Sequence, residues 1–299
     1  MKNKSKVSVF MVVVFAALAL YTFSMLILLF WGIITSLKEQ SDFRKNVLGL
    51  PKGAPWEWAW SNYPYVLQNF YVPVKRTIGG IVTPVNVGFG EQVVNTLLYA
   101  GIGSFIAAMV PCLVAYVTQK YEFYSGKIIF AVVLVTLSVP IIGAQPSEIR
   151  LLRAMDMYDT FWGAWLLKFN FLGMYYLVFY AMFKGISKEY SEAAYIDGAS
   201  EWTVMLRIMI PLAKVTILTV MCIKFIEFWN DYQVPLLYLP SHPTLSYGVF
   251  YMSISSLQGL NTVPMRMVGC VIVVLPILIL FCIGKDKLIG NISMGGVKE

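Results

Sequence analysis

Six long runs of apolar residues divide the chain, and each is long enough to cross a lipid bilayer as a helix. Backbone polar groups inside a bilayer must bond to one another, so we expect the runs to be helical. The pattern therefore predicts an all-α, polytopic membrane protein with six transmembrane helices. The runs cover residues 7–34, about 93–117, 128 to about 144, 161–183, about 215–229 and 267–283.

Three prolines fall inside these runs, namely Pro111, Pro140 and Pro276. Membrane helices tolerate proline because neighbouring groups satisfy the carbonyls that it leaves free. The first run also resembles a secretory signal, since lysines precede it. A signal has an apolar core of about 7–15 residues, whereas this run continues to Ile34. We therefore favour a retained first helix over a cleaved signal.

Composition supports a membrane protein and excludes a soluble globular one. Hydrophobic residues make up 58% of the 299 residues and charged residues only 13%, whereas soluble domains carry about 25% charged residues. The net charge of +7 comes from residues scattered between the apolar runs, so we expect a lipid bilayer and no nucleic acid as a partner. The four cysteines lie inside apolar runs and His242 is the only histidine. This pattern predicts neither disulfides nor a metal site.

The distribution of basic residues predicts that both termini are cytoplasmic. With six spans, the side of the termini holds twelve Lys and Arg residues, whereas the short loops opposite hold three. The long segment 38–92 holds six more, but long loops count for less in the positive-inside rule. The chain then divides into a first helix with its N-terminal segment (1–37), an extracytoplasmic loop (38–92), a core (93–285) and a cytoplasmic tail (286–299).

Aromatic residues are concentrated in the extracytoplasmic loop. They are Trp56, Trp58, Trp60, Tyr63, Tyr65, Phe70 and Tyr71. Aromatic side chains of this kind are typical of the membrane interface, so we favour an interfacial belt or a packed cap. The alternative is a docking surface for an external partner.

The segment 187–211, between the fourth and fifth runs, has its own helix signals. Ser187 can cap a helix whose first turn contains Glu189, which complements the helix dipole. Asp197 and Gly198 predict a turn, because glycine readily takes the left-handed conformation that ends a helix. Another protein could approach closely at the small side chains of Ala193 and Ala194.

A second helix is predicted directly after that turn. Ser200 can cap it, with Glu201 in its first turn. Pro211 removes one hydrogen bond and clashes with the carbonyl of Arg207, which predicts a kink where the chain enters the fifth span. The segment is thus expected to form a helix, a break, a second helix and an elbow.

The spacing in this segment resembles the EAA loop of ABC-importer permease subunits. The match consists of Glu192-Ala193-Ala194, then Asp197-Gly198-Ala199, and then Ile208-Met209-Ile210-Pro211. From Leu50 onward the chain is similar to carbohydrate permeases of the smaller, maltose-type class. Weaker matches are Leu50-Pro51-Lys52-Gly53, Asn95-Thr96-Leu97, Trp229-Asn230-Asp231, Pro235-Leu236-Leu237 and Gly295-Gly296-Val297-Lys298.

The resemblance implies the type I ABC-importer permease fold in a bacterial plasma membrane. The implied partners are a second, non-identical permease subunit, a cytoplasmic ATPase dimer that binds ATP and Mg, and an extracytoplasmic sugar-binding protein probed by residues 230–265. Glu192 would meet a basic residue of the ATPase; the alternative is a solvated carboxylate that caps its own helix. The residues implied in coupling are Glu192, Ala193, Ala194, Asp197, Gly198, Ala199 and Pro211, with a second contact at Gly295, Gly296 and Val297.

No phosphate-binding loop is present in the sequence. Gly126-Lys127 is followed by Ile128, and Tyr121 stands where the loop requires its first glycine. We therefore expect a transporter subunit, not an enzyme, with no cofactor of its own and with ATP hydrolysis in a separate subunit. The alternatives are a passive channel and a membrane-embedded enzyme. The enzyme would use the outer cluster Glu148, Arg150, Arg153, Asp156 and Asp159.

Ionisable residues inside a membrane span are functional candidates. Lys224 and Glu227 stand three residues apart in the fifth run, and with Trp229 and Asn230 they suit the binding of sugar rings in a translocation path. The alternative is a self-neutralising pair near the membrane interface. Lys168 and Asn170 are weaker candidates. The solute could also be a polyol or a sugar-derived oligomer.

Overall fold

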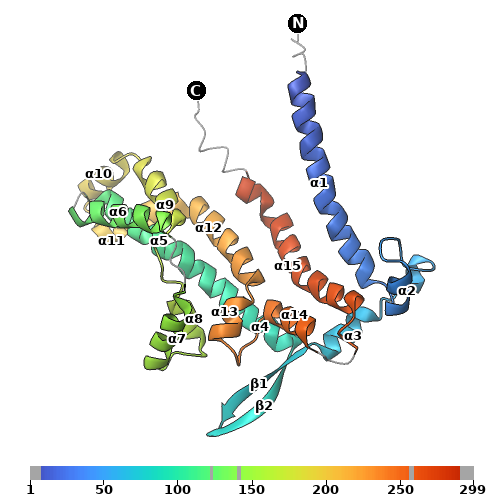
Figure 1. The fold of residues 1–299 in the computed structure, drawn as a ribbon. Helices are drawn as coiled ribbons and strands as arrows, with labels where there is room; N and C mark the ends of the chain where they lie inside the picture. Colours follow the sequence, from blue (N-terminus) through green and yellow to red (C-terminus); the bar gives the residue numbers. More distant parts are fainter. Residues whose placement is uncertain (1–7, 122–123, 140–142, 256–258, 290–299) are drawn as a thin grey trace. The chain divides into compact units, whose positions relative to one another are not determined.

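The computed structural model describes residues 8–121, 124–139, 143–255 and 259–289. The chain forms two compact units. One unit contains Met1–Phe70 and Val249–Pro276, and the other contains Tyr71–Gly248 and Ile277–Glu299. Figure 1 labels the helices and strands of both units.

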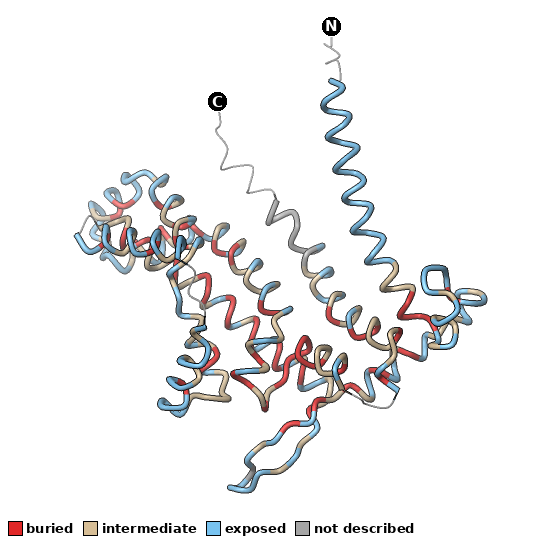
Figure 2. Tube along the Cα trace, viewed as in Figure 1, coloured by how far each residue is buried: buried red, intermediate tan, exposed pale blue. Residues whose placement is uncertain are grey.

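The first unit begins with α1 (Val9–Ser36), an apolar helix whose first 22 described positions, up to Phe30, are solvent-exposed on every side. Figure 2 shows this exposure along most of the helix. An apolar helix with no buried face requires an apolar surrounding, as a bilayer provides. Its end is fixed by the buried Asn62, whose amide donates to the carbonyls of Ser36 and Lys38 at 2.8 and 2.9 Å. The other elements are α2 (Gln40–Lys45), η1 (Pro55–Glu57), α3 (Asn62–Asn69) and the greater part of α14 (Leu245–Ile254) and α15 (Val263–Ile289).

The second unit begins with an antiparallel hairpin of β1 (Tyr71–Ile78) and β2 (Ile81–Gly88), in which Tyr71 pairs with Gly88 and Ile78 with Ile81. Gly79 and Gly80 close it with φ of +60° and +85°, the left-handed pair that a tight two-residue hairpin turn requires. The prediction of an all-helical chain is therefore wrong for residues 71–88. The rest of the described chain is mainly helical.

The core of this unit surrounds one long helical run. The run consists of α4 (Phe89–Leu97), a π-helical turn η2 (Leu98–Ile102) and α5 (Gly103–Lys120). Helix α5 packs against α9 (Met174–Lys184) and α12 (Ile210–Asn230). The small residues Ala100, Ser104, Ala108 and Cys112 are all fully buried, as expected for a stripe that lets helices approach closely.

Four described helices are long and apolar enough to cross a membrane: Val9–Ser36, Phe89–Lys120, Glu201–Asn230 and Val263–Leu280. Shorter apolar helices are α6 (Tyr124–Ser138) and α14. Pro111 and Pro276 lie inside α5 and α15, as predicted, whereas Pro140 lies outside the described residues. The number of six spans and the side of the termini stay predictions.

The fourth apolar run, 161–183, does not form the single helix that we predicted. It forms α8 (Phe161–Leu166) and α9, which are separated by residues 167–173. In this break the side chain of Asn170 accepts a hydrogen bond from the backbone N–H of Leu172 at 2.8 Å. Such a local bond competes with helix formation. The remaining short helices of the unit are α7 (Gln145–Ala154), α10 (Glu189–Ile196), α11 (Glu201–Val204), the π turn η3 (Met205–Met209) and α13 (Gln233–Tyr238).

Candidate functional site

Helix α10 ends in a well-formed C-terminal cap. The backbone N–H of Ala199 donates to the carbonyl of Ala194 at 2.9 Å, and that of Gly198 donates to Tyr195 at 3.0 Å. This pair of bonds is the Schellman motif, which requires a left-handed residue directly after the helix. Gly198 supplies it with φ of +78°. The predicted break at Asp197-Gly198 is confirmed, and its cause is backbone conformation, because a Cβ on Gly198 would meet no atom within 4 Å.

The two predicted helix starts have different outcomes. Ser200 caps α11 as expected and accepts from the N–H of Thr203 at 3.3 Å. At α10 the cap position is Lys188, one residue after the predicted Ser187, although the Ser187 hydroxyl still accepts from the N–H of Glu189 at 3.3 Å.

The helix does not break at Pro211, because α11, η3 and α12 form one helical run, Glu201–Asn230. The kink expected at Pro211 stays a prediction. The π turn η3 directly precedes the first turn of α12, where Pro211 lies. A π turn widens the helix locally. It therefore accommodates the proline ring and the missing N–H without a break in the helix.

The two faces of α10 differ sharply in burial. Ser191 and Ala194 are buried against the unit, at 3% and 9% exposure. Glu192 and Ala193 are exposed, and Ile196 is 87% exposed. The helix therefore turns a small residue inward and presents a carboxylate and an uncovered isoleucine outward.

A carboxylate that sequence reasoning placed only in a helix cap is the centre of a polar cluster. Glu201, the first residue of α11, accepts hydrogen bonds from the hydroxyls of Tyr121 and Tyr195, the latter at 2.5 Å. The ammonium of Lys120 lies 5.1 Å from the centre of the Tyr195 ring. Burial and the bond to Glu201 raise the pKa of the Tyr195 hydroxyl above its ordinary value, so this group keeps its proton and donates.

A second polar group lies on α12, where Lys224 and Glu227 form the predicted pair with Nζ and Oε2 2.8 Å apart. The Lys224 ammonium is 5.1 Å from the centre of the Tyr175 ring. On the break between α8 and α9, the Lys168 ammonium lies 4.1 Å from the centre of the Phe228 ring. Together these side chains line one cavity of about 260 Å³, which Asn170 also lines.

Trp229 and Asn230 do not line that cavity. The Trp229 side chain is only 4% exposed, and its ring packs 5.6 Å from that of Phe225. The Asn230 amide donates to the carbonyl of Ile226 at 2.8 Å, within its own helix. Sequence reasoning singled out these two and missed Tyr99, whose hydroxyl donates to Asp231 at 2.7 Å and whose ring centre is 5.1 Å from the Lys168 ammonium.

The segment expected to probe a binding protein is partly buried. Ser241 and the residues from Pro243 to Gly248 are buried, and His242 is half-buried. Arg76 of β1 donates to the carbonyl of Ser241 at 2.7 and 3.0 Å and pairs with Glu91 of α4. Residues 241–248 are therefore held inside their unit.

The outer charged cluster considered for an enzyme does not converge on one site. Glu148 accepts a hydrogen bond from the Tyr238 hydroxyl at 2.5 Å, and the Arg153 guanidinium lies 4.7 Å from the centre of the Tyr158 ring. Asp159 accepts from the backbone N–H of Ser241 at 3.0 Å and from its hydroxyl. Among the described residues no group of three His, Cys, Asp or Glu is placed to hold a metal ion.

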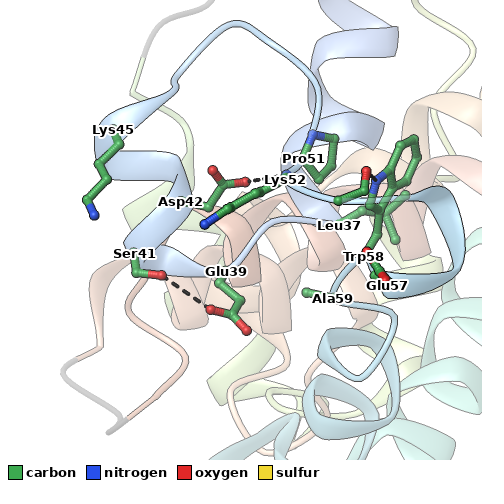
Figure 3. Close-up of a pocket in the computed structure, with 11 residues that line it drawn as sticks. Leu37, Glu39, Ser41, Asp42, Lys45, Pro51, Lys52, Glu57, Trp58 and Ala59 are labelled. Atoms are coloured by element: carbon green, nitrogen blue, oxygen red, sulfur yellow. Dashed lines mark hydrogen bonds between the residues drawn. The ribbon is translucent and has the colours of Figure 1, made fainter.

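The first unit contains a polar pocket of about 400 Å³ in the aromatic-rich segment, shown in Figure 3. Glu39, Asp42, Lys52 and Trp58 line it. Asp42 accepts from the N–H of Lys52 at 3.0 Å, and Glu39 accepts from the Ser41 hydroxyl at 3.2 Å. Glu57, which also lines the pocket, accepts from the N–H of Ala54 at 2.9 Å. The three acidic groups thus have partners in their own loop.

Residues 104–288, more than half of the chain, match the sequence profile of the family described as binding-protein-dependent transport system inner membrane component. The chain belongs to this family. The matched range contains all of α10 and α12 and most of α5. The predicted tail contact at Gly295, Gly296 and Val297 lies outside the described residues.

Several curated proteins are similar to this chain along most of its length. One is the probable starch degradation products transport system permease protein AmyC of Thermoanaerobacterium thermosulfurigenes, 26% identical over 89% of each chain. Another is the diacetylchitobiose uptake system permease protein NgcG of Streptomyces coelicolor, 22% identical over 94% of this chain and 86% of the relative. These relatives are permease subunits of transport systems and not enzymes.

The fold is also similar to a solved structure. A chain in the crystal structure of a bacterial ABC transporter involved in the import of the acidic polysaccharide alginate matches with a TM-score of 0.72 and 19% identity. The match covers 96% of this chain and 99% of that one. This match shows that the chain has the fold of an ABC-transporter permease.

Proposed function

We propose that this chain is one membrane subunit of an ATP-driven sugar importer in the bacterial plasma membrane, and that it couples solute movement to a separate ATPase. The observation that carries this proposal is the division of α10 into two faces. Its inner face is packed, whereas Glu192, Ala193 and the 87% exposed Ile196 stand uncovered. A surface that binds another protein combines an apolar centre with a polar rim, and Ile196 with Glu192 fits this arrangement.

In this proposal α10 is the coupling helix. Glu192 meets a basic residue of the ATPase, Ala193 permits close approach, and Ile196 fills an apolar recess. Asp197, Gly198 and Ala199 form the cap that fixes the end of the helix. Ala194 packs the helix onto its own unit, and Pro211 lies in the first turn of α12, directly after the π turn. ATP and Mg bind in the partner ATPase dimer.

The cavity at Lys168, Lys224 and Glu227 is proposed to line half of the translocation path. Aromatic rings with charged and amide groups offer sugars both stacking surfaces and hydrogen bonds. The relatives named for starch degradation products and diacetylchitobiose support a saccharide as the solute. A sugar-derived oligomer or a polyol would suit the same chemistry. The other half of the path comes from a second, non-identical permease subunit, and an external binding protein delivers the solute.

Purification of the tagged chain from its native membrane tests this proposal. We expect a second permease and an ATPase to co-purify. In proteoliposomes, uptake of the saccharide into the lumen should require ATP enclosed in the lumen and the binding protein outside. Uptake down a gradient without ATP would instead indicate a channel, and purification of the chain without any ATPase would contradict the coupling role of α10.

A further inference from the structure

The cluster at Glu201 connects α10 and α11, which are neighbours in the chain, to the end of α5, 80 residues earlier. Tyr195 belongs to the last turn of α10, Tyr121 directly follows α5, and Glu201 begins the helical run that continues into α12. Both tyrosine hydroxyls donate to the same carboxylate oxygen, Oε2 of Glu201. Figure 1 shows α10 and α11 at the end of the unit where α5 ends.

Without this carboxylate, α10 would be joined to its neighbours less firmly. Its covalent connection to α12 runs through the turn at Gly198, and its contact with the unit is through small side chains such as Ser191 and Ala194. Neither the turn nor these small side chains give α10 a polar bond to α5. The Glu201 carboxylate supplies one, and hydrogen bonds to a charged group are stronger and more directional than those between neutral groups.

The position of Glu201 favours its ionised form. It lies in the first turn of α11, where the helix dipole stabilises a negative charge. The Lys120 ammonium, at the end of α5, lies over the Tyr195 ring and adds a cation–π contact between α5 and α10. Two kinds of contact therefore join the same pair of helices beside the turn.

We infer that Glu201 is a positioning residue that makes α10, α5 and α12 move together, and that Tyr121 and Tyr195 are its two donors. This inference rests on the proposed function of α10 as the coupling helix. When an ATPase moves α10, the bond from Tyr195 carries the displacement to the start of α11 and α12, and the bond from Tyr121 carries it to α5. Loss of the Tyr195 bond separates α10 from Glu201 and so from both membrane helices at this cluster, whereas loss of the Tyr121 bond separates it from α5 alone.

The test uses the assembled transporter in proteoliposomes and measures ATP hydrolysed per solute imported. Tyr195→Phe and Tyr121→Phe each remove one hydroxyl, and we expect solute uptake per ATP to fall about fivefold, the effect of one weakened charged hydrogen bond. ATP hydrolysis and the amount of assembled complex should stay near normal. Tyr124→Phe is the matched control, because Tyr124 is exposed and lies in α6 outside the cluster.

A cycle of combined substitutions separates positioning from simple stabilisation. Glu201→Ala removes the shared acceptor, so adding Tyr195→Phe to it should cause no further loss, whereas Glu201→Gln keeps one acceptor oxygen and should cause an intermediate loss. Additive losses, or a parallel fall of uptake, ATP hydrolysis and thermal stability, would overturn the inference. A wild-type complex that imports without ATP would instead overturn the proposed function.

Discussion

Ala193 and Ala194 are neighbours in the chain but belong to different faces of α10. Ala194 is buried against its own unit and Ala193 is exposed. Successive residues in a helix are rotated by about 100°, so two adjacent small residues can serve two different packing surfaces. One alanine thus brings α10 close to its own unit, and the other leaves room for a partner on the outside.

Leucine at these two positions should therefore have different effects. Ala194→Leu overpacks a filled site and should lower the free energy of unfolding by about 1–3 kcal/mol. Ala193→Leu should leave stability unchanged and prevent the ATPase from co-purifying. Thermal unfolding of the detergent-solubilised chain and pull-down of the ATPase measure the two effects. Equal stability and equal ATPase binding in the two variants would contradict the two-face description of α10.

Substitution of Gly198 tests the cap. Because its φ of +78° is left-handed, Gly198→Val should strain the turn by about 1–2 kcal/mol and displace α10. Gly198→Asn is the matched control, since asparagine tolerates this conformation. We expect ATP-dependent uptake to fall strongly in the valine variant and little in the asparagine variant. Normal uptake with normal ATPase assembly in Gly198→Val would argue against α10 as the coupling element.

The cavity on α12 gives a prediction that distinguishes two neighbouring residues. Glu227 lines the cavity, whereas the Asn230 amide is bonded within its helix. Glu227→Gln should therefore raise the saccharide concentration that half-saturates uptake, and Asn230→Ala should not. Uptake at a series of saccharide concentrations, with the amount of assembled complex measured in parallel, checks this. An unchanged Glu227→Gln transporter would remove this cavity from the translocation path.

Local features of this fold could be predicted from the sequence because their causes are local. The apolar runs indicated the long helices, the left-handed Gly198 ended α10, and the Ser200 side chain capped α11. The π turn before Pro211 was not predicted, because a register change of this kind is not indicated by the residue types. Likewise the long apolar run 161–183 concealed a break, where the Asn170 side chain bonds to the backbone.

The hairpin was missed although a signal for it existed. Gly79-Gly80 is a strong two-residue turn, but Pro73 and Pro84 argue against strands. Both prolines are tolerated because each strand of a two-stranded ribbon is an edge strand. The cluster at Glu201 could not have been predicted in the same way. Its donor Tyr121 lies 80 residues away, and only the packing of α5 beside α10 brings them together.

Asp159, which holds Ser241 in place, should make the protein less stable in acid. Burial alone would raise the pKa of this carboxyl, but the bonds from His242 and Ser241 outweigh it and hold the pKa below its ordinary value. A lowered pKa means that the native state favours the ionised form. Its stabilising contribution is therefore complete above the ordinary aspartate pKa of about 3.9 and is lost as the pH falls through the lower native value.

Asp159→Asn isolates the charge, because asparagine also accepts the left-handed φ of +60° found at this position. At neutral pH we expect the variant to be about 1 kcal/mol less stable than wild type. When the pH is lowered below about 4, the stability of the variant should fall by less than the stability of wild type. Thermal unfolding of the two proteins between pH 3 and pH 7, in about the same ionic strength throughout, measures this difference. Parallel curves over the whole range would mean that the Asp159 charge does not hold Ser241, and that Arg76 and the surrounding packing suffice.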